Sequence, residues 1–234
     1  MSNIIAVLCS DIHLSQTPPS ARSSEPNWFD AMKRVLDEIR AVAGSHHIFC
    51  AGDVFDTWRS PPELINFAIA NLPLMYSITG QHDLPYHNYD DIRKSAYWTL
   101  IAAGAIGNLG PSNIEKITDV NLLVWSFPWG FEITPPDESH KHFDGVKLAV
   151  IHDYCWTRGK TYPGAPEEKA ASVWYKKLKG FDCAVFGDNH RPHLYQRQGA
   201  CPVLNSGTFI RRRADELDYK PGVGLLHASG KITR

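Results

Sequence analysis

The sequence predicts an α/β fold, because short apolar runs of strand length alternate with segments that have helical periodicity. The clearest apolar runs cover residues 4–9, 48–50, 74–79, 146–151 and 183–186. Their alternation with helical segments is typical of β-α-β units with parallel strands. Shorter runs, separated by turns rich in Gly and Pro, indicate antiparallel pairs late in the chain, at 194–198, 203–205 and 223–228.

Helices are expected at residues 28–43, 63–72, 91–103 and 167–178. In the first of them, apolar residues recur at three- and four-residue spacing and define one buried face: Phe29, Met32, Val35, Leu36, Ile39 and Val42. Gly44 follows as its C-cap, and Pro61 and Pro62 open the second helix. Two further short strands are expected at 114–117 and 121–125, and the segment 131–143 is interpreted as a surface loop.

Composition limits the class of protein. With 234 residues and 43% hydrophobic content, the chain can bury a large core, and we expect a single domain over residues 1–234. The 24 basic and 25 acidic residues nearly balance, so a nucleic-acid partner would need local clusters of charge or metal ions. An odd number of cysteines, several of them in apolar runs, indicates buried free thiols and a reducing compartment, the cytoplasm. We see neither a signal peptide nor a run long enough to span a membrane.

Each of the five clearest apolar runs ends at polar residues that can bind metal ions. These are Asp11 and His13; Asp53 and Asp56; Gln81, His82 and Asp83; His152; and Asp188 and His190. Because the carboxyl ends of the strands meet at one edge of an open α/β sheet, these residues can gather in one site. Carboxylate, amide and imidazole ligands without thiolates suit manganese, magnesium, iron or zinc. A pair of such ions can polarise a phosphate and lower the pKa of a bound water.

The stretch IFCAGDVFD, residues 48–56, contains the first candidate for a ligand shared by two ions. The strand ends at Ala51 and Gly52, and the carboxylate that follows, that of Asp53, can keep both oxygens free. A turn of this kind also serves simply to close a loop, and a single histidine at a strand end is more often an ordinary hydrogen-bonded residue. The recurrence of such residues at every strand end favours a metal site. The remaining histidines are interpreted as ordinary surface or loop residues.

The ordered motifs resemble those of the calcineurin-like metallophosphoesterases. They are D-x-H at 11–13, G-D-x-x-D at 52–56, a variant G-N-H-D at 80–83, the strand-end His152 and a variant G-H-x-H at 187–190. The resemblance extends from residue 11 to about 207. It implies a four-layer sandwich of two mixed β-sheets flanked by helices, with a dinuclear metal centre at the sheet edge.

The resemblance also implies a role for each residue. One metal would be held by Asp11, His13, Asp53 and His190, and the other by Asp53, Gln81, His152 and Asp188. His82 would lie over the scissile phosphate as a general acid or as a stabiliser of the transition state, and Asp56 would orient its neighbours. Gln81 replaces the usual Asn, and Asp188 replaces the usual His. The second change favours harder ions, so two manganese ions are expected, with magnesium, iron or zinc as alternatives.

Within the family, the segments GDVFDTWRSPP (52–62) and GQHDLPYHN (80–88) are most similar to SbcD-type nucleases, and especially to their short bacteriophage relatives. This resemblance implies a DNA exonuclease or endonuclease of repair and recombination with an SMC-like ATPase as partner; a homodimer is also considered. The chain is too short to contain the usual DNA-capping domain in full. Candidate contacts to the DNA backbone are Arg211, Arg212 and Arg213, together with Lys176, Lys177 and Lys179. Basic triplets on a neutral protein are more often just solvated surface.

Three functions stay open at this point. The first is the metal-dependent DNA nuclease. The second is a phosphodiesterase or pyrophosphatase that acts on a small molecule, such as a cyclic nucleotide or a nucleotide-linked lipid precursor. The third is a protein that keeps the fold but binds DNA or a partner without catalysis, which the departures at Gln81 and Asp188 suggest.

Overall fold

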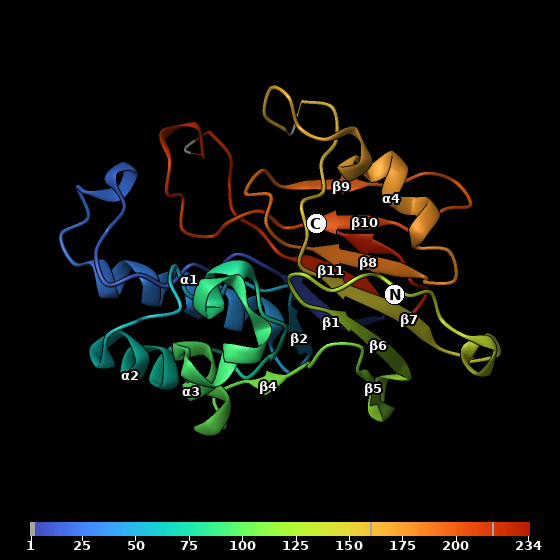
Figure 1. Ribbon diagram of the computed structural model, residues 1–234, viewed down its shortest axis with the longest axis horizontal. Coiled ribbons are helices and arrows are strands. Elements are labelled where there is room, and N and C mark those ends of the chain that lie inside the picture. Colours follow the sequence, from blue (N-terminus) through green and yellow to red (C-terminus); the bar gives the residue numbers. More distant parts are fainter. Residues whose placement is uncertain (1–2, 160, 217) are drawn as a thin grey trace.

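The computed structural model describes residues 3–159, 161–216 and 218–234. Two β-sheets lie face to face (Figure 1). The first sheet contains β1 (Ile4–Cys9), β2 (His47–Cys50), β3 (Tyr76–Ser77), β4 (Gly107–Asn108), β11 (Gly224–His227) and β12 (Ile232–Thr233). The second contains β5 (Ile114–Ile117), β6 (Leu122–Phe127), β7 (Val146–Ile151), β8 (Cys183–Phe186), β9 (His193–Tyr195) and β10 (Val203–Asn205).

Both sheets are mixed and six-stranded. Their strand orders are β12-β11-β1-β2-β3-β4 and β5-β6-β7-β8-β10-β9. In the first sheet β1, β2, β3 and β4 are parallel neighbours, and β11 and β12 are added as antiparallel strands at one side. In the second sheet β6, β7, β8 and β10 are parallel, and β5 and β9 are antiparallel edge strands. This arrangement confirms the predicted fold class, including the parallel units early in the chain and the antiparallel pairs late in it.

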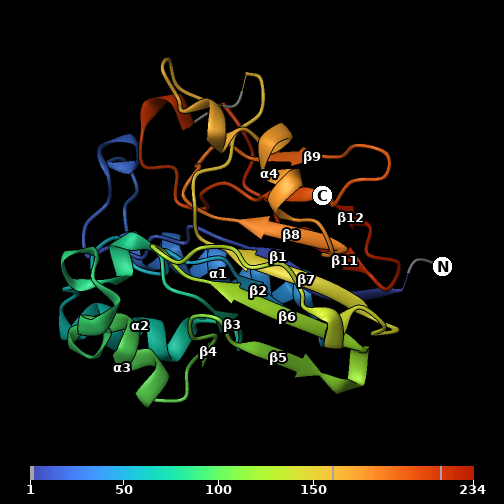
Figure 2. The same cartoon turned by 45° about the vertical axis from the view of Figure 1, so that its right-hand side comes forward.

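Helices cover the outer faces of the two sheets (Figure 2). The first sheet carries α1 (Trp28–Ala43), α2 (Pro62–Asn71) and α3 (Ala96–Ala102), and the second carries α4 (Ala171–Lys177). Among the helices of the described residues, none combines the length and apolar character required to cross a bilayer. All five cysteines are free, and only Cys201 is partly exposed.

The core has three apolar layers because successive side chains of a strand point to opposite faces. In β1, Val7 and Cys9 pack toward α1, whereas Ala6 and Leu8 pack between the sheets against residues such as Val150. The third layer lies between the second sheet and α4. Every central strand is therefore buried on both faces, which explains why these strands appear in the sequence as continuous apolar runs.

Several predicted elements are shorter or interrupted. The strand expected at 74–79 is only Tyr76–Ser77, and the helix expected at 91–103 is divided at Ser95 into a 3-10 turn, Tyr89–Lys94, and α3. Ser95 has an extended backbone, and its side chain accepts a hydrogen bond from Trp98 N as an N-cap. The helix expected at 167–178 is divided in the same way at Ala170.

Other differences concern the ends of elements. Val42 was expected on the buried face of the first helix, but its side chain is exposed, because the buried stripe continues from Ile39 to Ala43 and Val42 lies beside it. The sequence analysis missed the two-residue strands β4 and β12, which are too short to show a period. The loop at 131–143 is exposed as predicted over much of its length and contains one 3-10 turn, Glu138–His140.

Candidate metal centre

The polar strand ends meet at one edge of the two sheets. Strands β1 and β2 are parallel and in register, with Cys9 opposite Cys50, so both end at the same level. The backbone that follows stays paired, because Asp11 N donates to Gly52 O and His13 N donates to Asp53 O. Strands β7 and β8 of the second sheet also end together, with Ile151 opposite Phe186. Residues that are distant in sequence are thereby brought to one site.

Four of the gathered residues have left-handed backbone conformations. Their φ angles are 52° for Asp11, 51° for His13, 53° for Asp53 and 76° for Asp188. This region is sparsely populated by residues other than glycine and costs on the order of 1–3 kcal/mol at each position. The chain therefore turns sharply at each strand end and directs these side chains back over the sheet edge.

Asp11, His13 and His190 form the first group of ligand atoms. Together their ligand atoms lie within 4.8 Å of one another. His13 Nε2 faces His190 Nε2 at 3.0 Å and lies 3.8 Å from Asp11 Oδ1. The side chains of Asp11 and His13 are fully buried, whereas His190 is 20% exposed. Asp11 and His13 therefore form the buried side of the group, and His190 forms the side that solvent can reach.

Asp53 lies between the first group and His152. Its Oδ2 atom is 3.7 Å from His13 Nε2 and 3.5 Å from His152 Nε2. The other oxygen, Oδ1, accepts a hydrogen bond from His82 N. Among the described residues, Asp53 Oδ2 and Asp11 Oδ2 are buried and have no hydrogen-bond partner. An unpartnered buried carboxylate oxygen requires a physical explanation, and a bound cation would supply one.

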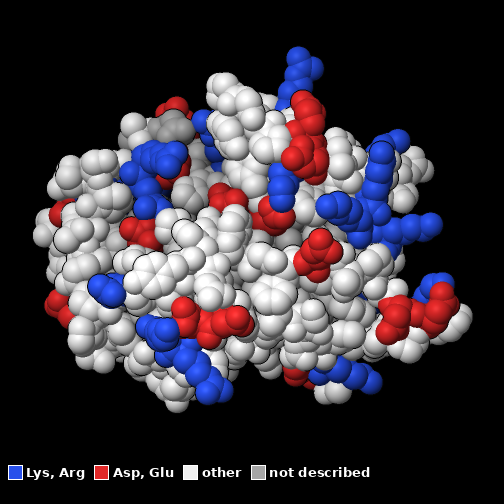
Figure 3. All heavy atoms as spheres, in the orientation of Figure 1, with Lys and Arg blue, Asp and Glu red and all other residues white. Residues whose placement is uncertain are grey.

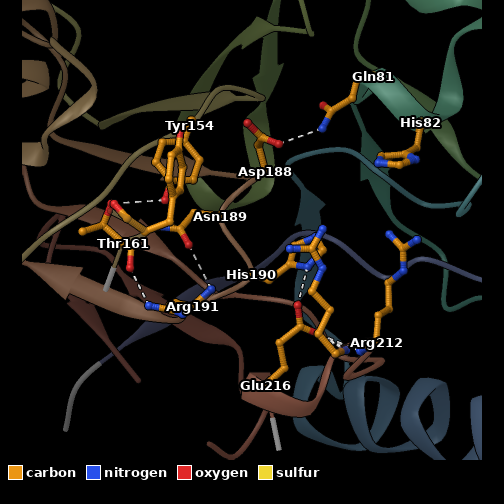
Figure 4. Close-up of a pocket in the computed structure, with 12 residues that line it drawn as sticks. Gln81, His82, Tyr154, Thr161, Asp188, Asn189, His190, Arg191, Arg212 and Glu216 are labelled. Atoms are coloured by element: carbon orange, nitrogen blue, oxygen red, sulfur yellow. Dashed lines mark hydrogen bonds and ion pairs between the residues drawn. The ribbon is translucent and has the colours of Figure 1, made fainter. Parts of the chain in front are cut away.

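Gln81 connects His152 with Asp188, and its bond to Asp188 is visible in Figure 4. Gln81 Nε2 donates to Asp188 Oδ1 at 2.7 Å, which directs Gln81 Oε1 to within 2.6 Å of His152 Nε2. His152 Nδ1 lies 2.5 Å from Ala51 O. The structure thus brings together only some of the residues predicted to hold the second metal ion. Asp53 and His152 share a group of possible ligand atoms with Asp11, but Asp188 is in none of the groups found among the described residues.

The residues present fit a divalent cation, because lone pairs converge without protons to share. A neutral imidazole carries one N–H, yet both contacts of His152 are to oxygens of amides, which only accept. His190 Nδ1 is bonded to Glu216 Oε1 at 2.8 Å, so the lone pair of His190 Nε2 points toward His13 Nε2. A cation between such atoms removes the conflict, and the hydrogen bonds at Nδ1 are those expected behind metal-bound histidines.

The electrostatics of the buried residues agree with this fit. Burial raises the pKa of Asp53 well above its ordinary value, and the neighbouring Asp83 and Asp11 carboxylates raise it further. Burial lowers the pKa of His13 well below its ordinary value, with His190 adding to the effect. His13 is therefore neutral, the form that binds metal, and the clustered carboxylates lack a positive charge that a cation would provide.

His82 and Asp56 lie beside this cluster and form a third group of ligand atoms with His13. His82 Nδ1 donates to Asp56 O at 2.9 Å, so its Nε2 atom is left for a substrate. Burial lowers the pKa of His82, and the positive charge of Arg212 contributes to the decrease. The Asp56 carboxylate is 2.6 Å from Arg212 Nη2 and 3.6 Å from His13 Nδ1.

The sequence analysis did not identify Glu216, which supports the centre from behind. Its buried carboxylate accepts from His190 Nδ1 through Oε1, and from Arg212 N at 2.6 Å and Arg213 N at 3.0 Å through Oε2. Burial by itself lowers the pKa of His190, but the hydrogen bond to Glu216 and the charge of Asp11 outweigh it, and the net shift is upward. Glu216 follows no motif, so no local signal in the sequence marks it.

Asp83 received no role from the sequence, but it holds two of the motifs together. Its buried carboxylate accepts from Val54 N, Phe55 N and Gly80 N at 3.0–3.3 Å. Burial raises its pKa to about 6. Gly80 itself has no room for a side chain, because a Cβ atom there would overlap the Asp53 carboxylate and the His152 ring. The turn that carries Asp53 and the turn that carries Gln81 are therefore locked against each other.

A family model described as calcineurin-like phosphoesterase matches residues 6–200. The chain belongs to the calcineurin-like phosphoesterase family. No curated protein matches this phosphoesterase. The family uses divalent metals, and the Asp and His groups described above are able to hold them.

Solved structures share the fold of this phosphoesterase. One crystal structure aligns over 100% of this chain and 98% of its own, with a TM-score of 0.57 and 13% identity. The sulfate thiohydrolase SoxB of Thermus thermophilus, solved with glycerol, covers 100% of this chain and 56% of its own, with a TM-score of 0.48 and 10% identity. A Vps29 single mutant from Entamoeba histolytica covers 94% and 84%, with a TM-score of 0.42 and 13% identity. At such identities the first likeness shows the fold alone, and the other two are too weak to carry an argument.

The predicted arginine triplet does not form a single surface in this phosphoesterase. Arg212 and Arg213 line the cavity beside the metal centre, whereas Arg211 lines a separate cavity with Arg22 and Phe209. The lysines of the second cluster, Lys176, Lys177 and Lys179, are exposed, and basic side chains gather around α4 (Figure 3). Contact of either cluster with DNA stays a prediction.

Proposed function

We propose that this calcineurin-like phosphoesterase is a metal-dependent phosphodiesterase that hydrolyses DNA, a nuclease of the SbcD type. One observation carries the reaction class: the unpartnered Asp53 Oδ2 lies between the imidazoles of His13 and His152, so one carboxylate can serve two cations. Without such a shared ligand, the two histidines would belong to separate sites.

In the proposed reaction, one ion would be held by Asp11, His13, Asp53 and His190, and the other by Asp53, Gln81, His152 and Asp188. Bound divalent ions polarise the phosphate and lower the pKa of water, the nucleophile of the hydrolysis. Because Asp56 O accepts from His82 Nδ1, His82 Nε2 would donate a proton to the leaving oxygen only as the imidazolium. Burial disfavours that form by lowering the pKa of His82, and the negative charge of a phosphate bound beside the ring would favour it. Arg212, held by Asp56, places a positive charge at the same cavity for a phosphate oxygen.

The choice of DNA rests on sequence resemblance and charge. The segments at 52–62 and 80–88 resemble SbcD-type nucleases, and Arg212 and Arg213 line the cavity next to the centre. The same resemblance supports an SMC-like ATPase as a partner and the cytoplasm as the location. We also propose that the protein forms a homodimer. Asp188 supports manganese as the metal, because an anionic oxygen in place of an imidazole favours a harder ion.

The test is manganese-dependent cleavage of end-labelled duplex and single-stranded DNA, with the Asp53→Ala variant as control. The proposal predicts cleavage by the wild-type protein and none by the variant. Intact DNA of every form at high enzyme and manganese, together with turnover of bis-p-nitrophenyl phosphate, would show that DNA is the wrong substrate.

One observation favours the second candidate, a small-molecule phosphodiesterase. The centre adjoins a cavity of about 470 Å³, a size that suits a single small ligand. A third candidate, a protein without catalysis, is supported by the hydrogen bond that holds Asp188 to Gln81. Absence of both manganese uptake and diester turnover would favour that candidate over the other two.

A further inference from the structure

The cavity beside the metal centre has two ends of different chemistry (Figure 4). One end is formed by residues of the centre and by basic side chains: Gln81, His82, Asp188, His190, Arg212 and Arg213. The other end is formed by the segment that follows β7, through Tyr154, Thr161 and Tyr162. The cavity is open to solvent, and its volume of about 470 Å³ is within the range of about 300–1,000 Å³ that holds small ligands in proteins.

The end away from the centre has an aromatic wall. The rings of Tyr154 and Tyr162 lie 5.3 Å apart at an angle of 54°. The backbone of Tyr154 is fixed by Trp174, because Trp174 Nε1 donates to the carbonyl oxygen of Tyr154 at 3.1 Å. Tyr162 is 50% exposed, although tyrosine side chains bury a large area when they are packed. An exposed tyrosine ring at the wall of a cavity is a surface on which a flat aromatic ligand can stack.

The polar groups of this wall are already engaged within the protein. Asn189 donates through Nδ2 to Cys155 O and accepts from Arg191 N through Oδ1. Arg191 Nη1 donates to Thr161 O, and Thr161 Oγ1 lies 3.4 Å from the Tyr154 hydroxyl. These bonds fix the wall, and they leave few groups to read the hydrogen-bonding edge of a base. Recognition here would therefore come from stacking, which every base permits.

We propose that this cavity binds the nucleoside of one unpaired nucleotide, with its base against Tyr162 and its phosphate at the metal centre beside Arg212. This inference rests on the proposed function and specifies its substrate. The separation of an aromatic end from a cationic, metal-binding end matches the two ends of a nucleotide. A volume of about 470 Å³ is too small for a base pair with its two backbones, so a base that enters the cavity and stacks on Tyr162 has left its duplex partner.

The test compares binding of dAMP with binding of 2-deoxyribose 5-phosphate in the presence of manganese, by calorimetry. The two probes share the phosphate and sugar, so the ratio of their dissociation constants isolates the base. Wild-type protein should bind dAMP at least about tenfold more tightly, as expected for one stacked base. Tyr162→Ala should reduce this ratio to about two or less, and Tyr162→Phe, which keeps the ring, should retain it. Tyr175→Ala, which removes a tyrosine of α4 that packs against Arg197, is the matched control and should keep the wild-type ratio.

Equal binding of the two probes by the wild-type protein, or an unchanged ratio in Tyr162→Ala, would overturn the subsite. These binding measurements do not depend on turnover. The proposed function is tested separately, by cleavage of bis-p-nitrophenyl phosphate and of DNA, so failure of one proposal can be distinguished from failure of the other. Cleavage of single-stranded ends ahead of blunt duplex ends would support the unpaired nucleotide, and equal rates on both would contradict it. If the protein hydrolyses thymidine 5′-p-nitrophenyl phosphate but cleaves no form of DNA, the nucleotide that binds here does not belong to a DNA strand.

Discussion

At the scale of single residues, the centre contains side chains with different tasks. His13, Asp53 and His152 present buried atoms that converge without sharing protons, as metal ligands do. His82 differs, because its Nδ1 is already bonded to a backbone carbonyl and its ring is partly exposed at the cavity. Substitutions should therefore separate metal binding from turnover.

His82→Ala should leave the manganese content near that of the wild-type protein and reduce turnover by about 10²–10⁴-fold, the usual effect of losing a general acid. Metal content is measured on the purified protein after dialysis, and turnover with bis-p-nitrophenyl phosphate. Because His82 also forms a group with His13 and Asp56, loss of metal in this variant would mean that His82 is a ligand instead.

Glu216→Gln should weaken manganese binding by about 10–100-fold, as expected when a partner behind a metal-bound histidine is lost. The amide can still accept from His190, but its NH₂ group would then face the backbone N–H groups of Arg212 and Arg213. Calorimetric titration with manganese measures the effect. Glu168→Gln, on an exposed residue, is the control and should bind as the wild type does. Equal affinity in both variants would remove Glu216 from the metal site.

At the scale of elements, tight turns place the site. The strands end in register, and left-handed residues such as Asp53 turn the chain so that carboxylates face the sheet edge. Asp83 then joins the turn after β2 to the turn after β3 through three backbone N–H groups. Buried hydrogen bonds of this kind are costly to break, about 1–3 kcal/mol for each group left unpaired.

Gly80→Ala should disturb both the centre and the stability of the fold. Its Cβ atom would overlap Asp53 and His152, so manganese affinity should fall by about tenfold or more, with a loss of about 1–3 kcal/mol in the free energy of unfolding. Gly110→Ala is the matched control, because the nearest atoms to its Cβ would lie 3.7 Å away. Urea unfolding and metal titration measure the two effects. Metal binding that is unchanged in Gly80→Ala would contradict the close packing of these turns.

At the scale of the whole molecule, the centre joins the two sheets. Asp11 and Asp53 follow strands of the first sheet, whereas His152 and His190 follow strands of the second. A cation bound by residues from both sheets would bind the folded state and not the unfolded chain. Metal binding and folding should therefore be coupled.

Manganese at 100 times its dissociation constant should stabilise the protein by about 2.7 kcal/mol, which corresponds to a rise of about 5–11 °C in Tm for a chain of this size. Thermal unfolding with manganese and with EDTA measures the shift. Asp53→Ala should lose most of it, because the variant lacks the ligand that faces both histidines. A full shift in Asp53→Ala would show that the ion binds elsewhere.

The amino-acid sequence by itself determined the fold class and marked the polar residues that gather at the sheet edge. Both are local properties: strands buried on both faces appear as apolar runs, and the polar residues follow directly where each run ends. The lengths of β3, α3 and α4 were not predictable in the same way, because side-chain capping at Ser95 and the extended backbone at Ala170 decide where a short element begins.

Only the tertiary structure decided which side chains meet. Glu216 lies 26 positions from His190, and Tyr162 and Arg212 line the same cavity, with no spacing in the chain to relate them. The separation of Arg211 from Arg212 and the bond that holds Asp188 to Gln81 are likewise set by packing. The physical reason is that such contacts depend on the positions of whole sheets and turns, which arise from the sum of many interactions and from no single segment.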